Sequence, residues 1–134
     1  MKILVLGSNE RSVLATIRSL GRAECEIDVF GLSKYSVVSH SKYTNNYYYL
    51  DTDIADQLKN YILDLVSTNA YDLILPCVDI FCLLIERDRV AYEKYAKISL
   101  PKNGSYEKMS DKKLLIDTSN KYNILTPITK CIIK

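Results

Sequence analysis

The sequence has little glycine and little proline, with four glycines and three prolines among its 134 residues. Its remaining composition is that of an ordinary globular protein, because 48% of the residues are hydrophobic and 25% are charged. This excludes a disordered or low-complexity tract. A chain of this length can bury a core without metal or disulfide staples, so we expect all of it to fold.

Metal-ligand clusters and long apolar runs are also missing. The four cysteines, Cys25, Cys77, Cys82 and Cys131, lie far apart in the sequence. None of them forms a C-x-x-C pair with a matching histidine cluster, so no zinc site is indicated. The apolar run at residues 1–6 is too short for a signal segment or a membrane span. The sequence therefore predicts a cytoplasmic chain with reduced thiols.

The charge balance is close to neutral. A net charge of +2 and a pI near 8.3 are too mild to indicate a nucleic-acid or membrane partner. Surfaces that bind phosphate backbones usually gather basic residues on one face. We expect neither a nucleic acid nor a membrane as a partner.

The apolar residues form short runs that alternate with amphipathic stretches of 12 or more residues. This alternation is typical of βαβ units, whose strands are covered on both faces. The predicted strands are residues 2–6, 25–30, 47–50, 72–75 and 97–100. The sequence thus predicts an α/β fold with a Rossmann-like open parallel sheet of four or five strands, helices on both faces and right-handed crossovers.

Four stretches have helical spacing. The first is expected to end at Gly21, the second near Asn69 and the third near Ala91. The last runs over residues 111–122, with Ser110 as its predicted N-cap.

The remaining segments are less regular. Asp51, Thr52 or Asp53 is the predicted N-cap of the second helix. Residues 33–46 are polar and predict an irregular segment with one short helical turn. Residues 128–133 begin an extended segment with nothing after it to continue into, which indicates a truncated protein.

Three segments are expected to meet where the strands end. They are residues 7–11, 31–33 and 77–79. In an open parallel sheet, ligands bind in the crevice at the carboxyl ends of the strands, where the strand order reverses. The sequence therefore predicts a ligand site at this edge of the sheet.

The turn after the first strand is the strongest candidate for a binding site. Gly7, Ser8 and Asn9 place unpaired backbone N–H groups at the start of a helix, which is a natural anion site. Arg11 could add positive charge. The alternative is that Gly7 only permits a tight turn and that Ser8 or Asn9 only caps the helix.

The same turn disfavours NAD. The dinucleotide fingerprint needs G-x-G-x-x-G and an acidic residue at the end of the second strand. Here Gly7 is the only glycine of the turn, and Phe30-Gly31-Leu32 ends the second strand without an acid. Glu10 would also repel a pyrophosphate.

Two further residues follow the fourth strand. Asp79 could bind substrate or cap the following helix. Cys77 lies at the same edge, but the only histidine, His40, is in a polar loop and gives the thiol no evident base. We therefore assign no catalytic residue.

One set of motifs spans the whole chain. It consists of Lys2-Ile3-Leu4-Val5-Leu6-Gly7, Leu73-Ile74-Leu75-Pro76 followed by Asp79, and Met109-Ser110-Asp111-Lys112 with Tyr122-Asn123-Ile124-Leu125-Thr126-Pro127. In order and spacing it resembles the N-terminal, pre-ATP-grasp domain of ATP-grasp ligases. That family includes biotin carboxylase, the carbamoyl phosphate synthase large subunit and D-alanine–D-alanine ligase. The resemblance is strongest to the carbamoyl-phosphate-synthase-like carboxylate–amine ligases.

The resemblance implies a domain division and an activity. Residues 1–101 would be the Rossmann-like pre-ATP-grasp domain, and residues 102–134 a linker helix and the start of a truncated ATP-grasp domain. The full-length enzyme would use ATP and Mg²⁺ to activate a carboxylate as an acyl phosphate, which an amine then attacks. The second ATP lysine and the acidic Mg²⁺ ligands would lie beyond Lys134, so this fragment would be inactive alone.

The resemblance also assigns a nucleotide contact and partners. A lysine or arginine at the position of Lys112 reaches ATP phosphates in the family; the alternative is that Lys112 is one of several solvated lysines. Asn123 stands where the family usually has glycine, and asparagine is the next best residue for a left-handed helix end. The implied partners are a small carboxylate substrate and the downstream ATP-grasp domain, and a homodimer is left open.

A second function, from another class, fits the same turn. A free-standing Rossmann-like regulatory module could bind a small anion or a nucleotide through Gly7-Ser8-Asn9. It predicts that the natural reading frame stops at Lys134, whereas the ligase predicts a continuing frame.

Overall fold

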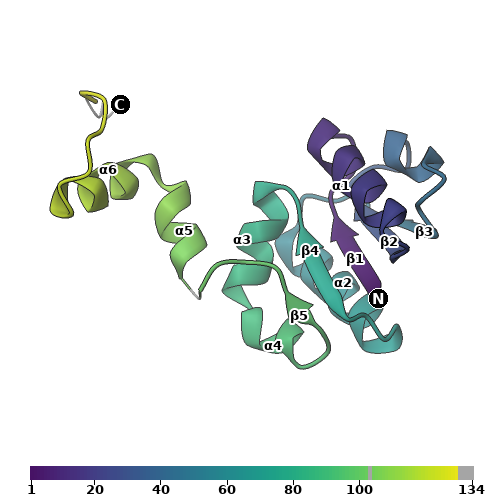
Figure 1. Ribbon diagram of the computed structural model, residues 1–134. Coiled ribbons are helices and arrows are strands. Elements are labelled where there is room, and N and C mark those ends of the chain that lie inside the picture. Colours follow the sequence, from purple (N-terminus) through teal and green to yellow (C-terminus); the bar gives the residue numbers. More distant parts are fainter. Residues whose placement is uncertain (103, 130–134) are drawn as a thin grey trace. The chain divides into compact units, whose positions relative to one another are not determined.

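The computed structural model describes residues 1–102 and 104–129. The chain divides into two compact units, Met1–Leu100 and Pro101–Lys134. Figure 1 follows the chain through both of them.

The first unit is built on a five-stranded sheet. Its strands are β1 (Lys2–Leu6), β2 (Glu26–Gly31), β3 (Asn46–Tyr49), β4 (Leu73–Pro76) and β5 (Lys97–Ile98), in the order β3-β2-β1-β4-β5. Every neighbouring pair is parallel. The predicted Rossmann-like open parallel sheet is therefore confirmed, although β5 is two residues long where four were predicted.

Helices cover both faces of this sheet (Figure 1). They are α1 (Arg11–Arg22), the 3₁₀ turn η1 (Val37–His40), α2 (Ala55–Thr68), α3 (Asp79–Arg87) and α4 (Arg89–Glu93). Side chains of β1 alternate between the two faces, as they do in any strand. Ile3 and Val5 pack in the core with α1 and η1, whereas Leu4 and Leu6 pack in the core with α2, α3 and α4.

Two predicted helix ends are wrong. Gly21 lies inside α1, which continues to Arg22. The third predicted helix is two helices, because the chain leaves helical geometry at Asp88, which is both the C-cap of α3 and the N-cap of α4. Both differences depend on packing against other segments, which the local pattern does not contain.

The predicted N-caps of the second helix are also wrong. The N-cap of α2 is Ile54, which has no side-chain capping bond. Thr52 does not bond to the helix itself. Its Oγ1 accepts from the N–H of the N-cap residue Ile54 at 3.2 Å. The helix ends at Thr68 with Asn69 as its C-cap, which confirms the predicted end near Asn69.

The described part of the second unit holds two helices, α5 (Ser105–Ser110) and α6 (Lys112–Lys121). The sequence did not predict α5, and Ser110 is its last residue rather than the N-cap of the next helix. That cap is Asp111, whose Oδ1 accepts from the N–H groups of Lys113 at 2.8 Å and Leu114 at 3.0 Å. A carboxylate that satisfies two free N–H groups is a strong N-cap.

Asn123, just after α6, has the left-handed conformation expected of it, with φ of 54°. The extended segment predicted at residues 128–133 is described only at Ile128 and Thr129, which have no regular structure. The rest of that segment, with Cys131, lies outside the described residues.

A carboxylate is fully buried inside the first unit. Asp28, in β2, is 0% exposed. Its oxygens accept from the Tyr71 hydroxyl at 2.7 Å and from Asn46 Nδ2 at 2.8 Å. Lys2 Nζ lies 3.9 Å from Asp28 Oδ2 and 5.1 Å from the centre of the Tyr71 ring. We call these four residues the Asp28 cluster.

Candidate functional site

The candidate site lies where the strand order reverses. The chain runs outward from β1 to β2 and β3, and then returns to β4 on the other side of β1. The turns after β1 and β4 therefore face each other at the carboxyl edge, which is where open α/β sheets bind ligands.

Gly7 is required by this geometry. Its φ is 146°, a value that residues with side chains rarely adopt. A Cβ on Gly7 would lie 2.8 Å from Val13 Cγ2 and 3.5 Å from Val78 Cγ1. The turns after β1 and β4 thus touch across Gly7, as the sequence predicted for these two segments.

Ser8 and Asn9 are held by the segment that follows β2. Ser36 Oγ donates to the Ser8 carbonyl oxygen at 3.0 Å, and Asn9 Oδ1 accepts from the Val37 N–H at 3.3 Å. Ser8 is 8% exposed. The alternative that Ser8 or Asn9 caps α1 is wrong, because the N-cap of α1 is Glu10.

Glu10 places a negative charge at the start of α1. Its Oε2 accepts from the Ser8 N–H at 3.1 Å. Arg11 follows as the first residue of the helix and is exposed. One backbone donor of the predicted anion site is therefore already bonded to a carboxylate of the chain itself.

Beside β2 the crevice is filled by side chains. A Cβ on Gly31 would lie 2.5 Å from Tyr47 Oη and 2.6 Å from Ser8 Cβ. The Tyr47 hydroxyl donates to the Ser33 carbonyl oxygen at 2.6 Å. Burial raises the pKa of Tyr47, and this outweighs hydrogen bonds from neighbouring serines that lower it. Tyr47 thus remains a neutral donor that closes this end of the crevice.

A small cavity opens next to the turn. Its volume is about 270 Å³, and Asn9, Tyr35, Ser36, Val37 and His40 line it. The cavity is near the lower limit of about 300 Å³ that is usual for ligand pockets. Its amide, hydroxyl and imidazole groups can hydrogen-bond a small polar ligand.

Sequence reasoning did not find Tyr35, Ser36 and Val37. The available signal was their position, in a polar irregular segment directly after a strand at the carboxyl edge. That signal places a loop near the site, but it does not say which side chains turn inward.

The two residues predicted after β4 lie at the same edge. Asp79 is the first residue of α3, and the N-cap is Val78, so the prediction that Asp79 caps this helix is wrong. Asp79 is exposed in the first turn, where a carboxylate is favourable. Burial raises the pKa of the Cys77 thiol to about 11, which leaves it protonated and poorly nucleophilic near neutral pH.

Lys112 belongs to the second unit. It is exposed and is the first residue of α6, directly after the Asp111 cap. The residues predicted to bind substrate all lie in the first unit.

Within residues 1–102 and 104–129, no group of three or more histidines, cysteines or acidic residues is placed to hold a metal ion. No helix in this described part is both long enough and apolar enough to cross a membrane.

Solved structures with the same fold come from larger enzymes. One is glycinamide-RNase-transformylase T from Mycobacterium tuberculosis, at 14% identity and a TM-score of 0.64 over 91% of this chain and 35% of that one. Another is the biotin carboxylase subunit of pyruvate carboxylase, at 21% identity and a TM-score of 0.68 over 91% of this chain and 27% of that one.

A third is the biotin carboxylase domain dimer of Hydrogenobacter thermophilus 2-oxoglutarate carboxylase, in complex with MgADP, ADP and bicarbonate. Its identity is 17% and its TM-score 0.63, over 90% of this chain and 27% of that one. No protein-family model matches the sequence, and no curated protein sequence matches it.

These likenesses confirm the Rossmann-like α/β fold that the resemblance implied. This chain spans about a third or less of the length of the three proteins above, at 27 to 35%.

Proposed function

We propose that this chain is the N-terminal, substrate-side domain of an ATP-dependent ATP-grasp ligase. The main support is the structural likeness over 91% of the chain. Since the first unit holds 100 of the 134 residues, a match of that extent includes residues of the second unit as well. The likeness thus extends past the Rossmann-like sheet, which many unrelated proteins share.

The substrate side of the proposed site is the carboxyl edge of the sheet. Gly7, Ser8, Asn9 and Arg11 would bind a small carboxylate, with Asp79 facing them from the next turn. The small size of the adjacent cavity and the hydrogen-bonding groups in its lining support a small polar acid rather than a large ligand. In the complete enzyme this acid would be activated as an acyl phosphate and attacked by an amine.

The nucleotide would bind elsewhere. Lys112 is an exposed cation at the start of α6 and suits contact with ATP phosphates. The described residues contain no acidic cluster that fits Mg²⁺. The proposal therefore assigns the Mg²⁺ ligands and a second ATP lysine to a downstream ATP-grasp domain of the same protein.

The proposal also covers the location and the partners of the protein. We propose a cytoplasmic enzyme that contacts neither nucleic acid nor a membrane. Its partners would be the downstream domain and a second copy of itself. The dimer is supported by one of the proteins with this fold, whose structure is that of a dimer.

The proposal is tested by calorimetry and by the reading frame. Residues 1–134 alone should bind MgATP weakly and hydrolyse none of it, because most of the nucleotide site would be missing. The frame should continue for about 150 to 250 residues, the size of an added domain. Tight, Mg²⁺-dependent ATP binding by residues 1–134, or a stop directly after Lys134 with no neighbouring frame to complete the enzyme, would favour the free-standing binding module.

In the complete protein, Lys112→Gln should raise the KM for ATP about tenfold or more. A hydrogen bond to a charged group contributes about 1.5–3 kcal/mol, and 1.4 kcal/mol corresponds to a factor of ten. Steady-state assays of carboxylate-dependent ADP release measure the effect.

Lys113→Gln is the matched control, because Lys113 is the next residue of the same helix and is also exposed. It should leave the KM for ATP within about twofold, as expected of a solvated lysine. Equal effects of the two substitutions would contradict a specific role for Lys112.

A further inference from the structure

A groove runs between α2 and α3, on the opposite face of the sheet from α1. Its volume is about 170 Å³. Leu58, Ile80, Leu83 and Leu84 form its apolar part, and Asp53 and Arg87 add the charges. All of these residues belong to the first unit. We call this surface the α2–α3 groove.

The apolar part of the groove has a buried floor and an exposed rim. Leu58 and Leu84 belong to the hydrophobic core and are 1% and 8% exposed. At the rim, Ile80 is 43% exposed, and Ile54, next to Asp53 in sequence, is 51% exposed. Adjacent aliphatic side chains left in water favour contact with another apolar surface.

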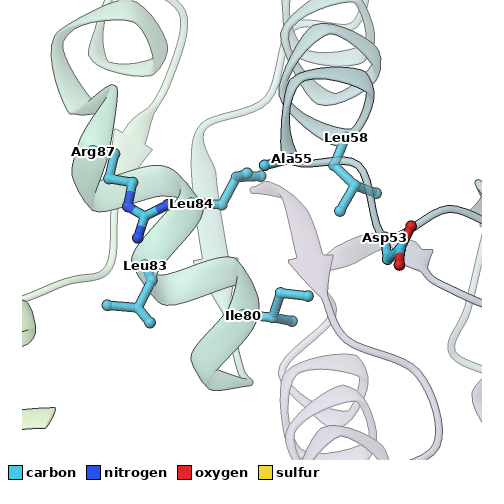
Figure 2. A pocket seen from close by; sticks show the side chains of 7 residues that line it. All are labelled: Asp53, Ala55, Leu58, Ile80, Leu83, Leu84 and Arg87. Atoms are coloured by element: carbon cyan, nitrogen blue, oxygen red, sulfur yellow. The ribbon is translucent and has the colours of Figure 1, made fainter.

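The two charges of the groove lie at its opposite ends. Figure 2 shows Asp53 at one end and Arg87, with Leu83 beside it, at the other, while Leu84, Ile80 and Leu58 lie between them. Both charged residues are exposed. Neither side chain has an ion pair or a hydrogen bond within residues 1–102 and 104–129.

This arrangement is complementary to itself. In a two-fold dimer, residue i of one copy contacts residue j of the other, and the reverse contact forms as well. A second copy seated on the groove would place its Arg87 against Asp53 and its Asp53 against Arg87, with apolar side chains in contact between the two pairs. A ligand of a single charge would satisfy only one end of the groove.

We infer that the α2–α3 groove is the contact surface of a symmetric dimer of this chain. The inference rests on the dimer named in the proposed function, but not on the ligase activity. Exposed ion pairs contribute little to affinity individually, so apolar contact would hold the dimer while the two pairs fix its orientation.

Sedimentation equilibrium of residues 1–134 tests the surface by exchanging its charges. Arg87→Glu and Asp53→Arg each place like charges together twice in the dimer, and each should raise the dimer Kd about tenfold. The double variant, with both substitutions, restores two opposite-charge pairs and should return the Kd to within about threefold of the original. Ile80→Asp should abolish the dimer.

Arg18→Glu is the matched control, because Arg18 is an exposed arginine of α1, across the sheet from the groove. It should leave the dimer Kd unchanged. A chain that stays monomeric up to about millimolar concentration would overturn both the dimer and this surface. A dimer that does not respond to the single substitutions, or that the double variant does not restore, would overturn the surface alone. Neither result bears on ATP use, which the assays of Lys112 measure separately.

Discussion

Asp28→Ala should lower the free energy of unfolding by about 1–3 kcal/mol, the usual cost of leaving a buried polar group without its hydrogen-bond partner. The substitution leaves the buried Tyr71 hydroxyl without its acceptor, and it also removes the acceptor of the exposed Asn46 amide. It also removes the buried charge that lies 3.9 Å from Lys2 Nζ. Urea unfolding followed by circular dichroism measures the change.

A substitution of Tyr71 removes a hydrogen bond from the Asp28 cluster without changing the volume of the buried ring. Tyr71→Phe should cost about 1.5–3 kcal/mol, because it removes one hydrogen bond to a charged group and keeps the ring. Burial raises the pKa of Tyr71, and the neighbouring Asp28 adds to the shift, so the hydroxyl stays protonated as the donor near neutral pH.

Asp72→Ala is the control for the Asp28 cluster. Asp72 is exposed and accepts from the backbone N–H of Lys2 at 2.7 Å, so it lies beside the cluster without being buried. It should change stability much less than Asp28→Ala does. A loss of under about 1 kcal/mol for Asp28→Ala, the typical effect of an ordinary substitution, would show that the buried hydrogen bond from Tyr71 to Asp28 does not stabilise the fold as described.

The Asp28 cluster illustrates what the sequence could and could not predict about the fold. An unbroken apolar run placed β1 correctly at residues 2–6, because a central parallel strand is covered on both faces. The strand over Asp28 was also predicted, but its charge has no local explanation. Its main donor, Tyr71, is 43 residues away in sequence.

The candidate site, too, could be predicted from the sequence only in part. The glycine turn could be predicted, because a strand followed directly by a helix fixes where Gly7 lies. The cavity beside it could not, since it depends on bonds from Ser36 to Ser8 and from Val37 to Asn9, each across 28 residues. Short-range patterns describe an element well and describe its distant partners poorly.

The prediction of the N-cap of α6 was wrong for a related reason, although the residues involved are neighbours in sequence. Ser110 and Asp111 are both good N-caps, and the sequence favoured the serine. The presence of α5 decides between them, because Ser110 is already the last residue of that helix. A cap can be assigned only after the end of the preceding element is known.

Gly21→Ala should destabilise the protein by about 1–3 kcal/mol, the usual cost of overpacking. Helix propensity alone predicts the opposite sign, since alanine inside a helix is favoured over glycine by about 1 kcal/mol. Here, however, a Cβ on Gly21 would overlap the Tyr43 side chain and come within 2.5 Å of its Cβ. Tyr43 Cβ is attached to the backbone and cannot move aside as the end of a flexible side chain could.

A double-mutant cycle with Tyr43 decides between packing and propensity. In a Tyr43→Gly background the overlaps with the ring and with Cβ are both gone, so adding Gly21→Ala should be neutral or stabilising, and the coupling between the two sites should exceed about 1 kcal/mol. Ser19→Ala, at an exposed position of the same helix, should follow propensity and stabilise slightly. If Gly21→Ala stabilises the original chain, then Tyr43 does not pack on α1 as described, and Gly21 is a weak point of the helix rather than a fitted contact.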